Sequence, residues 1–398
     1  MRIYYDYSSD SWYHRHKRKH GFFLGGSGLS LPFKPHTGSH LTVHVSPIQA
    51  HILTVGIVTG KHSKETNHPS GNLELFRELS SKLTQQGFFP FVFSLDDFSE
   101  GGFFGFVYSP QKEGWEKVKV PMPDVVYNRI PSRTIESSTD FYSFKRILKK
   151  HSIPIFNPRF IHKYELYQIF KENDFLASLL PETILLESSI QLYTFLKKQG
   201  SVYLKPVMGN KGSGIEVLTL EKDNKVTAAT TKRMNYYSGF NEFWFMESGK
   251  FLRNKYIAQQ AIVPKKVDGH RFDYRILVHF ENNEYTITGK AVRMSQSQEV
   301  TTHVPRGGRL FPYEQVQTEQ MDELLEKTAQ CCGSILSERL GFFGEFSMDL
   351  GEDETGRLFL YEVNSKPMKF DEANIETNRL QKLANIFIQL KYPGMGKT

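Results

Sequence analysis

Glu362 and Asn364 lie two positions apart in the otherwise mainly apolar run YEVNSKP, residues 361–367. In a β-strand, residues two apart share a face, so these two side chains are expected to project together. The preceding strand of the same hairpin should bring Asp349 alongside them. Two carboxylates and an amide oxygen on rigid strands form a set of hard oxygen ligands suited to Mg²⁺. The alternative is a solvent-facing polar stripe on an edge hairpin, and Glu345, which has the same strand parity as Asp349, is the reserve ligand.

A second candidate site lies in VYLKPVMGNKGSGIEV, residues 202–217. A strand that bears Lys205 runs into a loop with Gly209, Gly212 and Gly214, and a second strand follows. Glycines let backbone N–H groups approach phosphate oxygens closely, and a lysine on the adjoining strand adds a point charge. The run therefore predicts a phosphate cradle between two strands. A glycine-rich hairpin turn would show the same pattern, so both interpretations stay open at this point.

Several charged residues lie between these two candidate sites in the sequence. Asp273 and Arg275 occur in RFDYRILVHF, Arg293 in GKAVRMS and Arg306 in VPRGG. Arginines near a site that binds a metal and a nucleotide would neutralise phosphate charge and position an acyl phosphate. Each of them alone also fits a surface salt bridge, so their order along the chain carries more weight than any one residue.

The composition is that of a soluble globular protein with several domains. The chain has 398 residues, of which 39% are hydrophobic, 14% aromatic and 23% charged. No apolar run approaches the roughly 18 residues that a membrane-spanning helix needs. The amino terminus lacks the apolar centre and cleavage site of a secretory signal, so we expect an intracellular protein. The only two cysteines, Cys331 and Cys332, are adjacent and predict helix packing residues, because their spacing suits neither a disulfide framework nor a metal site.

The net charge of +7 and a pI near 9.0 favour anionic partners without choosing among them. The densest basic run, HRHKRKH at residues 14–20, lies beside several aromatic residues. A nucleic-acid binder that uses this run is one alternative. No RNA-binding signature accompanies the run, so a solvated basic strand or loop is the preferred interpretation and a nucleic-acid partner is not expected.

The order of apolar patterns predicts α/β and α+β architecture in four parts. Residues 1–50 indicate a β-rich segment, and residues 51–158 a small α/β domain with a parallel sheet. Residues 159–260 indicate an α+β lobe, which contains strands at TILL, SVYLKPV and GIEVLTL and a helix at SIQLYTFLKKQ. Residues 261–398 indicate a second α+β lobe, which carries the hairpin of Asp349 and Glu362. Two further helices are predicted over residues 163–174 and 314–340.

With these motifs in order, the chain resembles the ATP-grasp superfamily. The matching pieces run from about residue 163 to 367 and include LPET, YLKPVMGNKGSGI, YIAQQAI, DYRILV, AVRMS, RGG, MDL and YEVNSKP. More narrowly, PDVVYNRIPSR, IFNPRFIHKYELYQIF, LPET and EVNSKP look like the YheC/YheD-type ATP-grasp proteins that are associated with bacterial endospore coats. That narrower match extends upstream to about residue 51.

The resemblance implies ATP and Mg²⁺ as cofactors and a role for each candidate residue. Lys163 and Lys205 are implied to contact the phosphates and the adenine, and residues 209–214 to form the loop over the phosphates. Asp349, Glu362 and Asn364 are implied to bind Mg²⁺. The other implied positions are the phosphate-loop residues Gly209, Gly212, Ser213 and Gly214, the adenine pocket residues Gln259, Gln260 and Ile262, the nucleotide-site residues Asp273 and Arg275, and Arg293 and Arg306 on the phosphates or the acyl phosphate. Two positions depart from related ligases: Gln260 stands where Glu is frequent, and His303 where Asn is common.

The implied reaction is ligation of a carboxylate to an amine or thiol through an acyl phosphate, with ADP as a product. The acid and the acceptor are not identified by the sequence. The resemblance further implies a cytoplasmic location, association with the spore coat and spore coat proteins as partners. A rival interpretation is a structural or assembly protein of the coat that binds ATP without turning it over.

Overall fold

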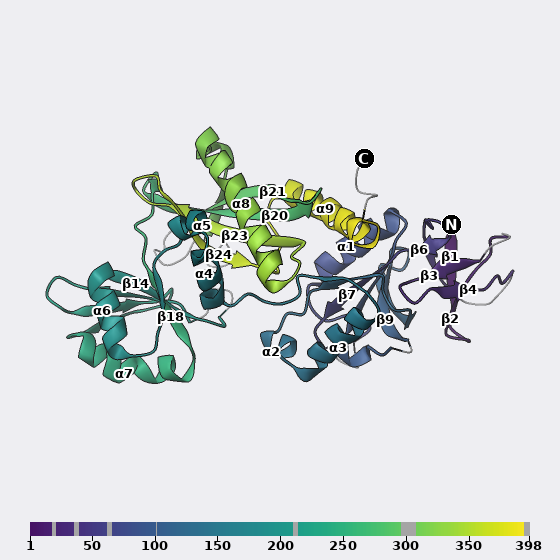
Figure 1. Cartoon of the computed structure of the whole chain (residues 1–398), viewed down its shortest axis with the longest axis horizontal. Helices are drawn as coiled ribbons and strands as arrows, with labels where there is room; N and C mark the ends of the chain where they lie inside the picture. Colours follow the sequence, from purple (N-terminus) through teal and green to yellow (C-terminus); the bar gives the residue numbers. More distant parts are fainter. Residues whose placement is uncertain are drawn as a thin grey trace.

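The fold is described from a computed structural model. The structure describes residues 1–17, 21–35, 40–61, 66–100, 102–209, 214–295 and 308–393. Its strands form five sheets. The β-rich amino-terminal segment lies at one end of the molecule, and the lobe built around residues 183–260 lies at the other (Figure 1). No helix within the described ranges has both the length and the apolar character that crossing a bilayer requires.

The amino-terminal segment folds into two small sheets. One has the strand order β2-β1-β5, with β1 (Arg2–Asp6), β2 (Ser11–His14) and β5 (His40–His44). The other has the order β4-β3-β6, with β3 (Phe22–Leu24), β4 (Leu29–Leu31) and β6 (His51–Ile52). Trp12 is buried, and its Nε1 donates a hydrogen bond to the carbonyl oxygen of Lys119, 2.8 Å away. This contact ties the segment to the sheet that follows.

The next sheet is six-stranded and mixed, with the order β10-β9-β8-β7-β11-β12. Its strands are β7 (Thr54–Thr59), β8 (Phe89–Ser94), β9 (Phe103–Ser109), β10 (Gly114–Val120), β11 (Val125–Asn128) and β12 (Ile155–Phe156). Strands β8, β7, β11 and β12 are parallel, as the sequence predicts. The prediction of a purely parallel sheet is wrong for β9 and β10, because the four residues between them can close only an antiparallel hairpin.

Helices cover both faces of this mixed sheet. Helix α1 (Leu73–Gln85) and the last helix of the chain, α9 (Ala373–Lys391), pack on one face in a shared apolar core. The other face packs against α3 (Thr139–Lys150) and the amino-terminal segment. Two short helices, α2 (Arg133–Glu136) and the 3-10 helix η1 (Leu95–Asp97), follow strand ends. The carboxy-terminal helix therefore completes a core that begins with residue 53.

The first lobe is an antiparallel sheet covered by two helices. The strand order is β13-β18-β14-β15-β16-β17, with β13 (Thr183–Leu185), β14 (Ser201–Pro206), β15 (Glu216–Leu220), β16 (Val226–Ala229), β17 (Met234–Tyr237) and β18 (Tyr256–Gln260). Helices α6 (Ser189–Gln199) and α7 (Phe240–Arg253) pack on it. The predicted strands and α6 are present, whereas β16, β17 and α7 were missed. Exposed Phe245 and Met246 disguise the amphipathic pattern of α7.

The second lobe carries a six-stranded antiparallel sheet, in which five strands have the order β22-β21-β20-β23-β24 and β19 (Lys266–Val267) also pairs with β20. The other five strands are β20 (His270–Glu281), β21 (Glu284–Ser295), β22 (Gly308–Phe311), β23 (Glu345–Glu352) and β24 (Leu358–Asn364). Helix α8 (Glu319–Leu340) shares an apolar core with this sheet, and α4 (Lys163–Lys171) and α5 (Asp174–Leu179) pack against α8. Cys332 is fully buried in α8, which confirms its predicted packing role.

Two predicted helix boundaries are wrong. The helix predicted over residues 163–174 ends at Lys171, because the side chain of Asn173 accepts a hydrogen bond from the Leu176 amide and starts α5. The helix predicted from residue 314 begins at Glu319, where Thr318 is the N-cap residue. The residues before it form the 3-10 helix η3 (Tyr313–Gln315).

Candidate functional site

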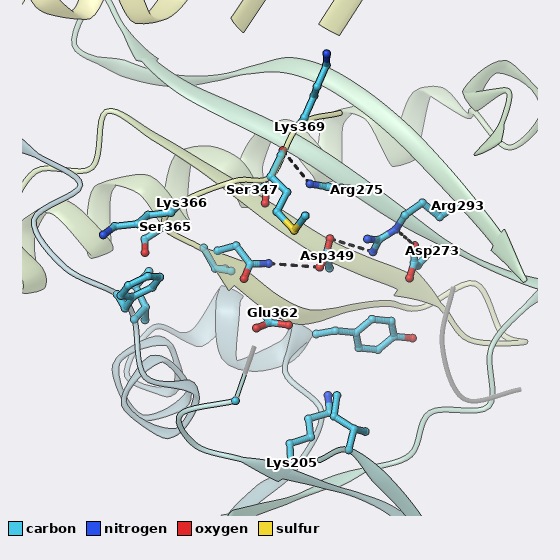
Figure 2. Close-up of a pocket in the computed structure, with 18 of the residues that line it drawn as sticks. Lys205, Asp273, Arg275, Arg293, Ser347, Asp349, Glu362, Ser365, Lys366 and Lys369 are labelled. Atoms are coloured by element: carbon cyan, nitrogen blue, oxygen red, sulfur yellow. Dashed lines mark hydrogen bonds and ion pairs between the residues drawn. The ribbon is translucent and has the colours of Figure 1, made fainter. Parts of the chain in front are cut away.

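A cavity of about 760 Å³ lies where the first lobe, the second lobe and the mixed sheet meet. Figure 2 shows Asp349 and Glu362 in its middle, with Lys205 on one side and Ser365 and Lys366 on the other. Most described candidate residues line this cavity: Lys205, Gly209, Gln259, Gln260, Ile262, Asp273, Arg275, Arg293, Asp349, Glu362 and Asn364. The fold thus brings together residues that lie far apart in the sequence, from Lys205 to Asn364.

The three predicted metal ligands are neighbours on the hairpin of β23 and β24. Asp349 pairs directly with Glu362, and Nδ2 of Asn364 lies 3.5 Å from Oδ2 of Asp349. A register shift between Asp349 and Leu350 places Tyr361 as an extra residue on β24. The solvent-facing stripe is excluded as an account of this face, because its residues line the cavity.

The oxygen set fits a divalent cation. Oδ1 of Asp349 is buried and accepts no hydrogen bond of good geometry, although Nη2 of Arg293 lies 3.1 Å away in an ion pair. Burial raises the pKa of Asp349 more than Arg293 lowers it. A buried carboxylate oxygen with spare acceptor capacity is what a hard cation requires. The set has only two carboxylates, and among the described residues no group of three or more His, Cys, Asp or Glu side chains forms a metal cluster.

Arg293 connects the two sides of the acidic centre. It is 4% exposed, and its Nε donates to Oδ1 of Asp273 at 2.9 Å. Burial disfavours its charged form, but Asp349 and Asp273 together raise the pKa of the guanidinium above its ordinary value. Arg293 is therefore held as a cation at the floor of the cavity (Figure 2).

Two lysines face the acidic centre from the first lobe and from α4. Lys163, the first residue of α4, forms an ion pair with Oε1 of Glu362. Burial opposes ionisation of Glu362, but the ion pair outweighs it and lowers the pKa of the carboxyl. Lys205 donates to Oε1 of Gln259 at 2.5 Å, and burial together with the neighbouring charge of Lys163 lowers the pKa of Lys205 to about 8.

The predicted adenine-side residues lie around the end of β18. Nε2 of Gln259 donates to Oγ1 of Thr183 at 3.1 Å, which fixes the amide so that its oxygen faces Lys205. Oε1 of Gln260 accepts the backbone N–H of Glu182 at 3.2 Å. Together with Ile262, these glutamines line the cavity, and their contact with adenine stays a prediction.

The predicted phosphate loop is described only at its two ends. Gly209 lines the cavity. Gly214 has φ of +73°, and a Cβ there would lie 2.9 Å from the Cγ of Pro206, so the turn into β15 requires glycine. Gly212, Ser213, His303 and Arg306 lie outside the described residues.

Arg275 lines the cavity but faces the loop after β24. Its Nη2 donates to the carbonyl oxygen of Met368 at 3.0 Å, and its guanidinium lies 4.4 Å from the ring centroid of Phe370. Burial lowers its pKa. Arg275 thus supports the segment that follows Asn364, in addition to bordering the candidate nucleotide site.

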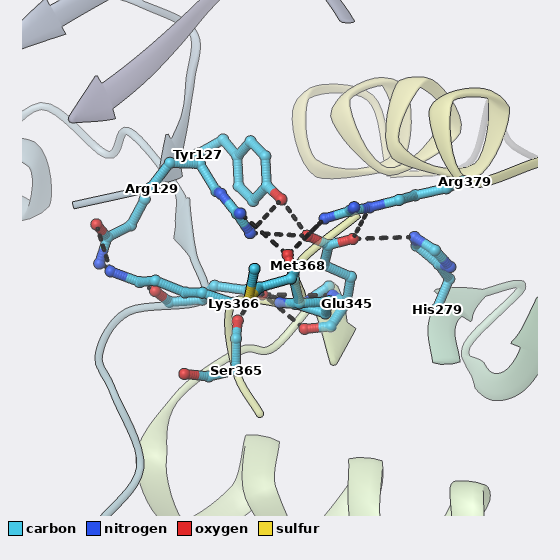
Figure 3. Close-up of polar contacts among 12 residues, drawn as sticks. Tyr127, Arg129, His279, Glu345, Ser365, Lys366, Met368 and Arg379 are labelled. Atoms are coloured by element: carbon cyan, nitrogen blue, oxygen red, sulfur yellow. Dashed lines mark hydrogen bonds and ion pairs between the residues drawn. The ribbon is translucent and has the colours of Figure 1, made fainter. Parts of the chain in front are cut away.

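Glu345 does not belong to the metal site, so the reserve prediction is wrong. Its carboxylate is fully buried and accepts hydrogen bonds from Nε and Nη2 of Arg379, both at 2.9 Å, and from the Tyr127 hydroxyl (Figure 3). Burial opposes its ionisation, but Arg379 holds its pKa well below the ordinary value. Arg379 and Arg129 also donate to the carbonyl oxygen of Pro367, at 3.2 and 3.1 Å. The cluster around Glu345 thereby fixes the loop that follows Asn364.

The sequence reasoning missed several lining residues, among them Arg129 and Arg133 around the end of β11, and Ser365 and Lys366 after β24. Nζ of Lys366 donates to Oε1 of Glu136 at 2.5 Å and to the carbonyl oxygen of Ile130 at 2.7 Å. Burial lowers the pKa of Lys366 to about 7 despite the opposing effect of Glu136. These residues lie in the quoted runs PDVVYNRIPSR and YEVNSKP, but their spacing alone gives no chemical signal.

The family model of the YheC/D-like ATP-grasp proteins matches residues 152–392. Two proteins of Bacillus subtilis (strain 168) are similar to this chain. The endospore coat-associated protein YheD is 29% identical over 347 residues, which cover 82% of this chain and 74% of YheD. The endospore coat-associated protein YheC is 25% identical over 276 residues, which cover 66% of this chain and 75% of YheC.

Among solved structures, the VanG D-Ala:D-Ser ligase from Enterococcus faecalis has a TM-score of 0.52 to this chain at 12% sequence identity. The likeness covers 85% of this chain and 99% of that ligase. At this identity it shows the fold alone, and it confirms the predicted ATP-grasp fold class. Because the family model matches more than half of the sequence, this chain belongs to the YheC/D-like ATP-grasp family.

Proposed function

We propose that this ATP-grasp protein is an ATP-dependent ligase that joins a carboxylate to an amine or thiol through an acyl phosphate. The observation that carries the proposal is the buried Oδ1 of Asp349, which keeps spare acceptor capacity beside Glu362 and Asn364. Lysines and an arginine surround this acidic centre, as an anionic nucleotide bound through Mg²⁺ would require. The proposal assigns ATP to the cleft between the lobes of residues 159–260 and 261–398.

In this proposal, Asp349, Glu362 and Asn364 would hold Mg²⁺, and the bound cation would supply positive charge that neutralises the phosphates. Glu362 is paired with Lys163 in the described structure. With Glu362 serving as a ligand, the ammonium of Lys163 would be available to a phosphate oxygen. The ion pair thus holds both side chains in place before the nucleotide arrives.

The nucleotide would lie with its base against Gln259, Gln260 and Ile262 and its phosphates toward Lys205 and Arg293. The amide groups offer both donors and acceptors to a purine edge. Arg293 is fixed by Asp273 and by burial, so its charge needs no reorganisation when phosphate charge moves. Arg306 and residues 209–214 belong to the same proposed phosphate site.

The proposed reaction has two steps. A substrate carboxylate oxygen attacks the γ-phosphorus of ATP, the bond to the β-γ bridging oxygen breaks, and ADP leaves. An amine nitrogen or thiol sulfur then attacks the acyl carbon, phosphate leaves with the electron pair, and the nucleophile loses its proton. Positioning and electrostatic stabilisation by Lys205, Arg293 and Arg306 would supply most of the catalysis.

The relatives named endospore coat-associated support a second part of the proposal, which is association of this protein with the spore coat. A protein that binds ATP in the coat without turnover is the rival function. ADP release, measured with Mg·ATP in the presence and absence of pooled amino acids, separates the two. Stimulated release supports the ligase, and nucleotide-dependent stabilisation without release in any pool supports the rival.

Binding itself is tested by thermal melting, because a ligand that binds only the folded state stabilises it. Mg·ATP at millimolar concentration should raise the melting temperature, and ATP with excess chelator should raise it less. An unchanged melting temperature with Mg·ATP would contradict both the ligase and its rival.

A further inference from the structure

One end of the cavity is lined by residues 129–133 and 365–369 and carries several cations. Three of these cations have acidic partners. Arg129 lies 3.3 Å from Oε1 of Glu345, and Lys366 lies 2.5 Å from Oε1 of Glu136. Lys369 lies 2.5 Å from Oε1 of Glu74. The charges of these residues are therefore compensated within the protein.

Arg133 is different from the other cations at this end. Its Nη1 donates to the carbonyl oxygen of Ile161 at 3.1 Å, and its guanidinium lies 4.7 Å from the ring centroid of Phe160. Its Nε is buried without a hydrogen-bond partner, and within the described ranges it forms no ion pair with a carboxylate. Burial lowers its pKa, and the charge of Glu362 is the largest influence that opposes this shift. The contacts fix the guanidinium but leave donor capacity unused.

A second unused polar group lines the same end. Ser365 is 3% exposed, and its Oγ has no hydrogen-bond partner. A buried hydroxyl without a partner costs free energy, so a ligand that accepts its hydrogen bond would bind favourably. Ser365 follows the proposed metal ligand Asn364 directly in the chain, and the backbone of this loop is held by Arg129 and Arg379 through Pro367. Ser365 is thus held on a fixed loop and lines the same cavity as Asp349 and Glu362 (Figure 2).

We propose that Arg133 and Ser365 bind the carboxylate of an amino-acid acceptor, so that the amine of the same molecule reaches the acyl phosphate. This inference rests on the proposed ligase function and adds the chemical class of the acceptor. An arginine with free N–H groups and a hydroxyl donor match the two oxygens of a carboxylate. The proposed function assigns the nucleotide phosphates to the side of the cavity near Lys205. The end lined by Arg133 and Ser365 is therefore available to the acceptor.

The test uses the full chain with saturating Mg·ADP and ligand-observed NMR. The probes are a pool of α-amino acids and a matched pool of their amides, which keep the amine and lack the carboxylate. The strongest binder and its amide are then titrated. The amino acid should bind at least about tenfold more tightly than its amide, which corresponds to the loss of one charge-assisted hydrogen bond.

Arg133→Gln should weaken binding of the amino acid by about 10- to 100-fold and leave the affinity for Mg·ADP unchanged. Arg133→Lys keeps the charge but loses the planar donors, so it should restore part of the affinity. Arg146→Gln, an exposed arginine of α3 in the same domain, is the matched control and should bind like wild type.

The assignment is overturned if wild type binds amides as tightly as amino acids, if it binds neither pool, or if Arg133→Gln keeps wild-type affinity. Binding of Mg·ADP is measured first and separately. Its absence in wild type would contradict the proposed function and this inference with it, whereas normal Mg·ADP binding without amino-acid binding would contradict the acceptor site alone.

Discussion

Binding of nucleotide should be accompanied by proton uptake at Lys205. In the free protein, burial and the charge of Lys163 lower the pKa of Lys205 to about 8. A phosphate oxygen beside the ammonium would favour its charged form and return the pKa toward the ordinary value of about 10.4. Lys205 therefore has to be protonated in the complex at pH values where it is largely neutral in the free protein.

The size of the effect follows from these two pKa values. Uptake per bound Mg·ADP should be close to zero at pH 6.5, about half a proton at pH 8 and about 0.9 of a proton at pH 9. The affinity should fall about tenfold between pH 7 and pH 9, because proton binding becomes part of the binding equilibrium. Below pH 7, Lys205 should make no contribution to the pH dependence.

Isothermal titration calorimetry in two buffers that differ in ionisation enthalpy measures this uptake directly. Lys205→Met should abolish uptake at pH 8 and weaken Mg·ADP binding by about 1.5–3 kcal/mol. Lys366→Met is the matched control, since the pKa of Lys366 is also lowered, to about 7, but its ammonium is paired with Glu136. Uptake below about 0.1 of a proton at pH 8 in wild type, or equal uptake in wild type and Lys205→Met, would refute the reasoning.

Two further predictions separate the carboxylates of β23 and β24. Glu362→Gln removes an anionic ligand but preserves the shape of the side chain. Mg²⁺-dependent ADP formation should therefore fall about 100-fold or more, and the melting transition should stay cooperative. Equal activity of the variant and wild type would show that Glu362 is not a metal ligand. Glu345→Gln should leave the Mg²⁺ dependence of ADP formation unchanged but destabilise the protein by about 3 kcal/mol in urea unfolding, since it leaves Arg379 buried without its main partner. The pKa of Glu345 is depressed in the folded state, so the difference in unfolding free energy between wild type and Glu345→Gln should be present at neutral pH and shrink as the pH falls below about 4.3. A difference that stays constant with pH would contradict the ion-pair account.

The hairpin at the site could be predicted because its signal is local. Alternation along β24 places Glu362 and Asn364 on one face, and the short connection to β23 forces Asp349 to lie opposite. The same alternation could not separate Asp349 from Glu345. The two residues differ because Arg379, on helix α9 after the hairpin, forms an ion pair with Glu345. The alternation of residues in β23 does not predict that contact.

The other end of the cavity shows where local reasoning stops. Arg133 and Ser365 matter because Nε of Arg133 and Oγ of Ser365 lack partners, and a missing partner is a property of the assembled fold. Sequence patterns describe which face of an element a residue occupies. They do not show whether a residue of another domain supplies a hydrogen-bond partner for its side chain. The motif order nevertheless placed Lys205, Gln259, Gln260 and Arg293 correctly around one cavity, because the order of elements fixes the topology.

The position of α9 has a consequence for synthesis on the ribosome. Leu383, Ile386 and Phe387 fill the core on one face of the mixed sheet, whose strands are made long before them. Domains generally fold as they emerge from the ribosome. Helix α1 covers part of this face of the domain of residues 51–158, but the part that α9 covers must stay exposed until both lobes have been translated. Closure of this core therefore waits for α9, and chaperone capture of the exposed part of that face should end only when α9 docks.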